Sequence, residues 1–456
     1  NAEGAIEQFT KGAVDQILAR CDRILENGET VPLTREQISR IQNENHRMAG
    51  KALRVLAAAY REYDELSTEV SADTAEQGLT FIGLVGMTDP IRPEVFDAIQ
   101  KCRKAGIKPV MITGDHRDTA VAIARQLGIL YSEDQVVTGQ QLSGMSDAQL
   151  DKVVSHTAVY ARVQPEHKVR IVAAWKRKGR ITAMTGDGVN DAPALKVADI
   201  SVGMGVTGTD VTKNVADMVL SDDNFASIIV AVQEGRRIYD NIRKAIQYLL
   251  SSNLAEILTI FVATIIGWRV FAPIHILWIN LITDTLPAIA LGKEEAEQDI
   301  MSKPPRNPKD SVFADHLGAD VITEGMLIGM LTLWSFFTGV AQSQITGMTM
   351  AFFTLSMCEI FHSVDLRSRL KSIFMMKGHN QTLIDATLIS FLLTLAVIYI
   401  PGLNTAFGLE ALRPWNLLGA LGIAALIIPL VELKKWLKRI AHKKTRAADA
   451  KAADAQ

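Results

Sequence analysis

Six apolar stretches follow one another in the second half of the chain, and they constrain its fold more than any other feature. Each is close to the ~20 residues that a helix needs to cross a bilayer. A buried helix of a soluble protein could explain any one of them, but a series of six favours an all-α, six-helix membrane domain over residues 245–436. The stretches are 245–267, 273–292, 320–341, 347–365, 383–401 and 414–433.

Lysine and arginine are distributed unevenly between the segments that flank these stretches. They gather before the first stretch and after the second, fourth and sixth, whereas the alternate loops carry little beyond Arg269 and Arg413. Since cytoplasmic loops carry the excess of positive charge, both ends of the chain are predicted to be cytoplasmic. Residues 223–244 are then a stalk in front of the membrane domain. The Ala-, Lys- and Asp-rich residues 437–456 are a cytoplasmic tail.

Two of the stretches contain polar side chains spaced to share one helix face. They are Asn253 and Glu256 in the first stretch, and Asn280, Thr283 and Asp284 in the second. Inserting a carboxylate at mid-bilayer costs about 2.5–3.5 kcal/mol of free energy, so such a group normally has a bonding partner or a functional role. Carboxylate and amide oxygens suit a hard cation such as Ca²⁺. The alternative is hydrogen bonding that only packs the helices together. Pro287 lies one turn further on and can free a backbone carbonyl.

The first half of the chain is charged and alternates short apolar strands with helices. Residues 79–222 show this alternation throughout, which predicts an α/β domain built on a doubly wound parallel sheet. Residues 1–78 are expected to form a smaller α+β unit, in which Thr34 is the N-cap of a helix and Lys11 lies in a loop.

A Thr-Gly-Asp turn follows two of the predicted strands, at Thr113-Gly114-Asp115 and at Thr185-Gly186-Asp187. Because the carboxyl ends of parallel strands meet at one edge of a sheet, both turns are expected to face one crevice, where such sheets bind phosphate and metal. A single turn rich in Asp and Asn could equally serve only to cap a helix.

The side chains near these turns suit phosphoryl transfer, which needs a metal, cations and hydrogen-bond donors around the phosphate oxygens. We expect Asp187 to ligate Mg²⁺ and Lys168 to offer a point charge to phosphate. Thr113 and Asn190 can hydrogen-bond phosphate oxygens. Asp191 can keep these side chains in position without touching the metal.

The composition argues against other classes of function. No basic patch with interleaved aromatic residues indicates a nucleic-acid partner. The three cysteines, Cys21, Cys102 and Cys358, are scattered and odd in number. They are therefore expected to be reduced thiols and not a disulfide framework.

The motif TGDGVNDAP at residues 185–193 resembles the hinge motif of P-type ATPases, the cation pumps that pass through an aspartyl-phosphate. The resemblance extends from Lys11 to about Lys438 and is strongest to the calcium-pump branch. It implies a HAD-like phosphorylation domain over residues 79–222, preceded by the C-terminal part of a nucleotide-binding domain.

The resemblance also implies roles for single residues in the first half of the chain. Lys11 would lie in the adenine pocket and Arg54 would contact the ATP phosphates. Thr113-Gly114-Asp115 and Lys168 would also belong to the ATP site. Asp115 and Arg162 would contact the nucleotide or the hinge between domains. Asp89-Pro90 would be a conformational element between domains.

In the membrane domain, the resemblance places Asn253 and Glu256 at calcium-ligand positions of the fifth pump helix. Asn280, Thr283 and Asp284 fall at those of the sixth, and residues 299–306 are similar to the loop that follows it. Around residues 358–367 we find no clean match to the eighth-helix glutamate of two-site pumps. Arg367 could place a fixed charge there instead, which leaves the number of ions open.

The resemblance implies ATP-driven transport of Ca²⁺ with Mg²⁺ as cofactor, in a multi-pass protein of a bacterial plasma membrane in contact with its lipid. The phosphorylated DKTGT motif of the family does not occur in this sequence. We expect it upstream, together with the actuator domain and membrane helices 1–4, and we expect this chain alone not to hydrolyse ATP by the family mechanism. The alternatives are a pump for Mn²⁺, Mg²⁺, Na⁺/K⁺ or H⁺, and a non-catalytic membrane regulator or phosphatase that uses the same sheet.

Overall fold

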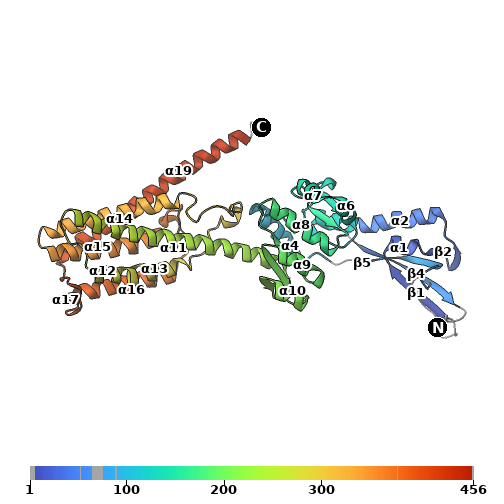
Figure 1. Cartoon of the computed structure of the whole chain (residues 1–456), viewed down its shortest axis with the longest axis horizontal. Helices are drawn as coiled ribbons and strands as arrows, with labels where there is room; N and C mark the ends of the chain where they lie inside the picture. Colours follow the sequence, from blue (N-terminus) through green and yellow to red (C-terminus); the bar gives the residue numbers. More distant parts are fainter. Residues whose placement is uncertain (1–5, 52, 64–74, 88–89, 377, 454–456) are drawn as a thin grey trace. The chain divides into compact units, whose positions relative to one another are not determined.

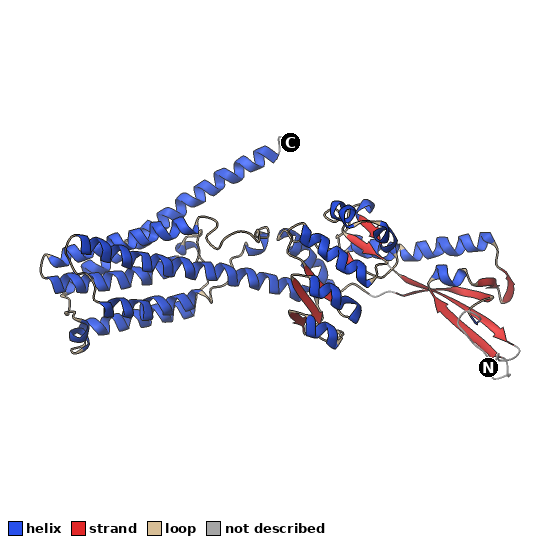
Figure 2. Cartoon of the chain, in the orientation of Figure 1, coloured by secondary structure: helices blue, strands red, loops and turns tan. Residues whose placement is uncertain are grey.

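The computed structural model describes residues 6–51, 53–63, 75–87, 90–376 and 378–453 (Figure 1). The chain divides into two compact units. One consists of residues Asn1–Val230 with Met301–Pro305, and the other of Ala231–Ile300 with Arg306–Gln456. The first unit mixes helices and strands, and the second contains helices joined by loops (Figure 2).

The amino-terminal part of the first unit is a five-stranded sheet in the order β1-β4-β5-β2-β3. Its pairs are antiparallel except β2 with β5. Helices α1 and α2 accompany this sheet, and apolar side chains such as Ile17, Ala59 and Leu79 form the core. The elements are β1 (Ile6–Gly12), α1 (Val14–Leu18), β2 (Cys21–Glu26), β3 (Glu29–Pro32), α2 (Arg35–Ala49), β4 (Arg54–Tyr63) and β5 (Leu79–Met87).

Thr34 is the N-cap of α2, as the sequence predicted. Its hydroxyl accepts from the backbone N–H of Gln37 at 3.3 Å, while the Gln37 side chain accepts from the N–H of Thr34 at 2.9 Å. This reciprocal capping box satisfies two N–H groups that have no partner inside the helix.

Two predictions about this region were wrong. Residues 79–87 were expected to open the α/β domain, but β5 pairs with β4 and β2 and therefore belongs to the first sheet. Lys11 was expected in a loop, but it lies near the end of β1, opposite Ala58 of β4. Apolar alternation identifies a strand, whereas the choice of sheet depends on partners far away in the sequence.

The rest of the first unit contains two parallel three-stranded sheets, in the orders β6-β8-β7 and β11-β10-β9. Parallel pairing confirms part of the predicted α/β class. In the described residues, however, the strands do not form one continuous doubly wound sheet. The strands are β6 (Met111–Ile112), β7 (Val136–Thr138), β8 (Val159–Ala161), β9 (Ala183–Gly186), β10 (Ile200–Met204) and β11 (Met218–Leu220).

Helices cover both faces of the β6-β8-β7 sheet. Neighbouring side chains of β8 point to opposite faces, and each face packs against different helices. Val159 packs with residues of α5 such as Val121, whereas Tyr160 packs with Leu150 of α7 and Ile171 of α8. The helices of this part are α4 (Pro93–Lys104), α5 (Arg117–Gln126), α6 (Gly139–Gly144), α7 (Asp147–Val153), α8 (Pro165–Arg177), α9 (Ala192–Val197) and α10 (Asp210–Val215).

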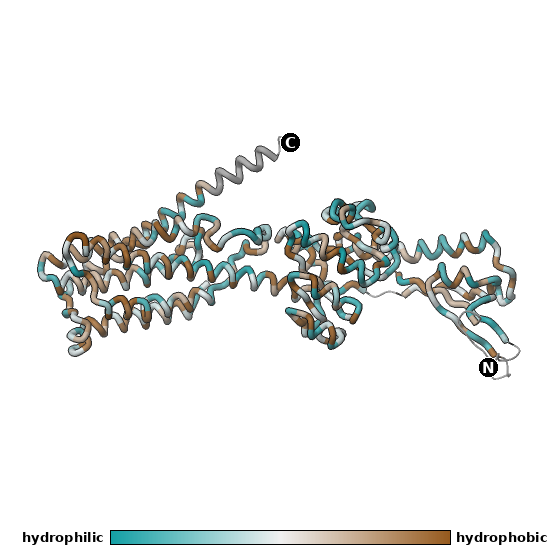
Figure 3. The backbone as a smooth tube through the Cα atoms, viewed as in Figure 1, coloured by the Kyte–Doolittle hydropathy of each residue, from teal (hydrophilic) through white to brown (hydrophobic). Residues whose placement is uncertain are grey.

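The second unit is a helical bundle whose helices carry apolar residues along much of their length (Figure 3). Helix α11 has 41 residues, so the predicted stalk and first membrane stretch form one continuous helix. The helices are α11 (Phe225–Ile265), α12 (Pro273–Trp278), α13 (Thr285–Leu291), α14 (Leu317–Val340), α15 (Gln344–Asp365), α16 (Gln381–Tyr399), α17 (Leu403–Phe407), α18 (Pro414–Ala425) and α19 (Ile427–Ala453).

Five spans among the described residues are long and apolar enough to cross a membrane, by length and composition, whereas six were predicted. The exception is the predicted stretch 347–365, which forms most of α15. Every residue from 349 to 360 of this helix is buried, and α15 packs against α14, α16, α18 and α19. A helix surrounded in this way can carry polar side chains that a lipid-facing helix could not.

Candidate functional site

The turn after β9 is organised by one buried carboxylate, that of Asp191. Its Oδ1 lies 2.5 Å from Nζ of Lys168 on α8. Its Oδ2 accepts from the backbone N–H groups of Asp187 at 3.3 Å and Gly188 at 3.5 Å. A side chain on Gly186 would collide with Asp191, so this close approach requires glycine. Asp191 therefore joins Lys168 to the turn that carries Asp187.

Asp187 and Asn190 are both exposed at this turn, whereas Lys168 is only 19% exposed. The three residues provide a carboxylate, an amide and a cation at the end of one strand. This donor set suits a metal-bound phosphate, because oxygen ligands hold Mg²⁺ and the ammonium group neutralises phosphate charge.

The second Thr-Gly-Asp turn follows β6 and is closed by its own side chains. The Thr113 hydroxyl donates to Asp115 Oδ2 at 2.9 Å and accepts from the Asp115 N–H at 3.1 Å. The N–H of Arg162, whose backbone is left-handed with φ +52°, donates to the Asp115 carbonyl at 3.0 Å. Arg162 thus lies beside the turn, and its contact with the nucleotide or the hinge stays a prediction.

Within the described part of the chain, no hydrogen bond or ion pair joins the Thr113 turn to the Asp187 turn. Among the described strands, β6 pairs only with β8 and β9 only with β10, so each lies at the edge of its sheet. Thr113 directly follows β6, whereas Thr185 and Gly186 are the last residues of β9 and Asp187 follows them. Lys11 and Arg54 are exposed on the five-stranded sheet. Asp89 lies outside the described residues.

Three buried carboxylates meet in the helical unit. One oxygen from each of Glu256 on α11, Asp284 and Glu359 on α15 lies within 4.8 Å of the others. None of these residues is more than 4% exposed. We call these three residues the carboxylate cluster.

Neutral groups supply the hydrogen bonds of the carboxylate cluster. Asn280 Nδ2 donates to Glu256 Oε1 at 3.0 Å, and the Thr283 hydroxyl donates to Glu359 Oε2 at 2.7 Å. Ser252 Oγ contacts both Asp284 and Glu359. The other oxygen of Asp284, Oδ2, is buried and has no hydrogen-bond partner. Three buried acids with neutral partners and a free oxygen form an environment that favours a cation.

The local backbone explains how Thr283 and Asp284 reach this position. Residues Ile279–Asp284 form a π-helical segment. Pro287 has no N–H, so the Thr283 carbonyl, four residues earlier, has no helical partner. The hydroxyl of Tyr248 on α11 donates to that carbonyl at 2.7 Å. The carbonyls of Asn280 and Ile282 accept from Thr285 Oγ1 at 2.8 Å and Ser390 Oγ at 3.0 Å.

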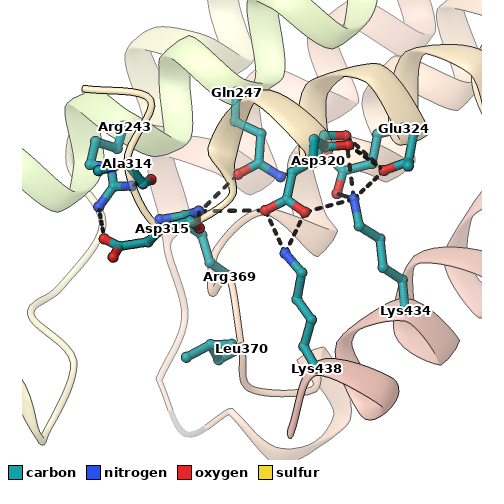
Figure 4. A network of polar contacts seen from close by, with 12 residues as sticks. Arg243, Gln247, Ala314, Asp315, Asp320, Glu324, Arg369, Leu370, Lys434 and Lys438 are labelled. Carbon is teal, nitrogen blue, oxygen red and sulfur yellow. Dashed lines mark hydrogen bonds and ion pairs between the residues drawn. The ribbon is translucent and has the colours of Figure 1, made fainter. Parts of the chain in front are cut away.

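A second polar network in the helical unit pairs its buried acids with cationic side chains (Figure 4). Asp320 and Glu324 of α14 lie beside Lys434 and Lys438 of α19. Lys434 Nζ is 2.8 Å from Glu324 and 3.0 Å from Asp320, and Arg369 is 3.4 Å from Asp320. Each acid of this network has a cationic side chain as partner, whereas the carboxylate cluster is bonded by Ser, Thr and Asn.

Two residues of the carboxylate cluster and its surroundings were missed from the sequence. Glu359 was passed over when the eighth-helix glutamate was sought, although it is a carboxylate inside an apolar stretch and its type alone could have indicated it. Ser252 was not singled out. A serine in an apolar helix is common and carries no signal until its neighbours are known.

Two further residues had expected roles near the ion. Asn253 lies one helical turn before Glu256 on α11, and its Nδ2 donates to the Leu249 carbonyl at 2.8 Å. Its role as a calcium ligand stays a prediction. Arg367 was considered as an alternative source of fixed charge near the ion. Its guanidinium instead binds Glu294 at 2.9 Å.

Comparisons with known proteins match both parts of the chain. Residues 2–94 match the family model "P-type ATPase, cytoplasmic domain N", and residues 269–437 match "Cation transporting ATPase, C-terminus". The first match extends across β5, in agreement with the sheet pairing.

Curated relatives resemble the chain over almost all of its length. Calcium-transporting ATPase 1 of Bacillus cereus is 46% identical over 450 residues, which cover 94% of this chain and 50% of that protein. Calcium-transporting ATPase of Bacillus subtilis is 45% identical, with coverage of 92% and 47%. Human calcium-transporting ATPase type 2C member 1 is 38% identical, with coverage of 95% and 46%. The chain thus spans about half the length of these relatives.

Proposed function

The chain belongs to the P-type cation ATPases, and we propose that it provides the carboxyl-terminal half of a pump that moves Ca²⁺ across a membrane with energy from ATP. Its relatives bear the name calcium-transporting ATPase. The observation that carries the proposal is the carboxylate cluster, in which three separate helical segments direct one buried acid each to a common point.

Ca²⁺ suits this site better than a soft metal does, because every available ligand is an oxygen. Glu256, Asp284 and Glu359 supply carboxylates, and the Thr283 hydroxyl lies against Glu359. Three carboxylates exceed the charge of one divalent ion. Glu359 also supplies an acid from α15. The sequence had shown no clean match to the eighth-helix glutamate of two-site pumps, and that had argued against a second ion. These features support a site that holds more than one positive ion.

We assign phosphoryl transfer to the residues around the Asp187 turn. Asp187 would hold Mg²⁺, which supplies positive charge to the phosphate oxygens. Lys168 would add a second positive charge from α8, and Thr113 and Asn190 would donate hydrogen bonds. Asp191 keeps Lys168 beside the turn through the 2.5 Å contact. In this arrangement the chain binds and orients a phosphate but does not itself provide a nucleophile.

The nucleophile would come from a strand outside this sequence. Among the described strands, one edge of β6 and one edge of β9 have no partner; Thr113 follows β6, and Asp187 follows β9. A parallel strand that paired with both would complete one doubly wound, HAD-like sheet, and would bring Thr113 and Asp187 to the same edge. That strand would carry the phosphorylated aspartate, and the actuator domain and four further membrane helices would accompany it.

The remaining roles follow from family membership. Lys11 and Arg54 would bind ATP on the nucleotide-binding domain, and Asp115 and Arg162 would contact the nucleotide or the hinge. The helices make the chain part of a multi-pass membrane protein. Its location would be the plasma membrane of a bacterium, with both ends of this chain in the cytoplasm.

Transport by the full pump tests the proposal. Sealed vesicles that contain the pump should take up Ca²⁺ when ATP is supplied, in preference to Mn²⁺ and Mg²⁺. Asp284→Asn should abolish Ca²⁺ uptake and Ca²⁺-dependent phosphorylation by ATP, because the ion loses a charged ligand. Phosphorylation by inorganic phosphate should persist in this variant, which separates an ion-site defect from misfolding. Normal Ca²⁺ affinity in Asp284→Asn would refute the site and the choice of ion.

A further inference from the structure

The carboxylate of Asp223 organises a loop that follows β10. It accepts backbone N–H groups from Gly205 at 2.6 Å, Val206 at 3.0 Å and Thr207 at 2.7 Å, and the Thr207 hydroxyl at 2.7 Å. Asp223 itself has a left-handed backbone, with φ +48°, a conformation that is uncommon for a residue with a side chain. These hydrogen bonds, that of Val206 foremost, hold the pKa of the carboxyl at about 2.

The other end of the same loop supports the Asp187 turn. The N–H of Thr209 donates to the Asp187 carbonyl at 2.9 Å, and the Thr212 hydroxyl lies 3.5 Å from the same oxygen. Between these ends the loop is tight, because a side chain on Gly208 would collide with the Met204 carbonyl. The loop therefore links the Asp223 carboxylate to the backbone of Asp187 through a short and closely packed segment.

Asp223 also lies at the start of α11. Its carbonyl accepts from Nη1 of Arg92 at 3.1 Å. The side chains on either side of it bond to the first turn of the helix: Asn224 Oδ1 accepts from the N–H of Ala226 at 2.9 Å, and Asp222 Oδ2 accepts from the Ser227 hydroxyl at 2.6 Å. One short segment thus contacts the loop that supports the Asp187 turn and continues into the helix that carries Glu256.

We propose that Asp223 is a positioning residue for phosphoryl transfer, which fixes the Asp187 turn through the loop at residues 205–209 and ties it to the first turn of α11. The inference deepens the proposed function and rests on it. Nothing in it requires Asp223 to touch phosphate or metal, because its own carboxylate is fully engaged by the loop.

A matched control lies at the opposite end of β10. The Asp217 carboxylate accepts from the backbone N–H of Ser201 at 2.9 Å and from its hydroxyl at 2.7 Å, so it also anchors this sheet with hydrogen bonds. Among the described residues, no hydrogen bond or ion pair joins this carboxylate to the loop at residues 205–209. Asp217→Asn should therefore reproduce a general loss of hydrogen bonding without the effect on the Asp187 turn.

The first experiment is hydrogen–deuterium exchange on the full pump in detergent, a measurement that does not depend on the proposed activity. Asp223→Asn places an amide where three N–H donors converge, so it should accelerate exchange at the Thr209 amide and in the Asp187 turn by about tenfold or more. Asp217→Asn should leave both segments at the wild-type rate. Unchanged exchange at Thr209 in Asp223→Asn would overturn the proposal.

The second experiment measures phosphorylation of the full pump by inorganic phosphate over a range of Mg²⁺ concentrations. Asp223→Asn should raise the Mg²⁺ concentration for half-maximal phosphorylation about fivefold or more, while Asp217→Asn should match wild type. Faster exchange with an unchanged Mg²⁺ requirement would show that the loop is only structural, and would also overturn the proposal. If the wild-type pump takes up no phosphate at all, the proposed function fails and this inference falls with it.

Discussion

The hydroxyl of Tyr248 donates to the backbone carbonyl of Thr283 at 2.7 Å, in the place of a helical N–H that Pro287 cannot provide. This bond joins α11 to the π-helical segment at the point where Asp284 enters the carboxylate cluster. A proline and a tyrosine on different helices thus act together to position a buried acid.

Tyr248→Phe should destabilise the protein by about 1–3 kcal/mol, because it leaves a buried carbonyl unsatisfied. It should also weaken Ca²⁺ binding several-fold, since the Thr283 segment is then less well held. Tyr399→Phe is the matched control, because the Tyr399 hydroxyl donates to the Leu412 carbonyl at 3.0 Å away from the cluster. Thermal unfolding with and without Ca²⁺ distinguishes the two variants. Equal Ca²⁺-induced shifts would contradict the positioning role of Tyr248.

Glu359→Gln should lower Ca²⁺ affinity by at least about tenfold, because affinity for a hard cation depends on the charge of its ligands. Glu410→Gln serves as the control, since Glu410 accepts hydrogen bonds from Thr346 and Ser343 outside the cluster. The measurement is Ca²⁺-dependent phosphorylation of the pump by ATP. Wild-type Ca²⁺ affinity in Glu359→Gln would remove Glu359 from the ion site.

Lys168→Ala should slow phosphorylation of the pump at least about tenfold, because a fixed positive charge near the phosphate is lost. The variant also leaves the buried Asp191 carboxylate without its cation, at a cost of about 1–3 kcal/mol. Lys176→Ala on the same helix removes an exposed ion pair with Asp199. It should change neither the phosphorylation rate nor the stability of the protein. Rapid-quench phosphorylation from ATP is the test, and an unchanged rate in Lys168→Ala would count against the assignment.

Acid should reveal the contribution of Asp223 to stability. Its pKa is lowered from 3.8 to about 2 in the folded protein, so its stabilising effect is complete above about pH 4 and is lost as the pH falls through about 2. The stability difference between wild type and Asp223→Asn should therefore shrink between pH 4 and 2. Thermal unfolding of both proteins across this range is the measurement. A difference that stays constant with pH would show that the carboxylate is not bonded as described.

Several features of the fold and of the sites could be predicted because their signals are local. The capping box of α2 needs only Thr34 and Gln37, three residues apart. Glu256 and Asp284 stood out as acids within apolar stretches, and Pro287 indicated a freed carbonyl nearby. In each case the residues that carry the signal lie within about one helical turn of each other, so a single sequence contains the whole pattern.

Other features depended on neighbours that are distant along the chain. The sheet to which β5 belongs is decided by pairing with β4 and β2. Ser252 and Asn253 are adjacent in sequence, yet only Ser252 contacts Asp284 and Glu359. Helical spacing places several polar residues on plausible faces, and the packing of the other helices selects which of them reaches the site.

Sequence patterns alone thus indicate a strand–helix half and an apolar helical half, with two Thr-Gly-Asp motifs and acids within apolar stretches. The packing of the helices brings Glu359 to Glu256 and Asp284, pairs Arg367 with Glu294 and encloses α15. These features differ because apolar periodicity and turn chemistry are properties of short segments, whereas the meeting of three carboxylates depends on how whole helices pack.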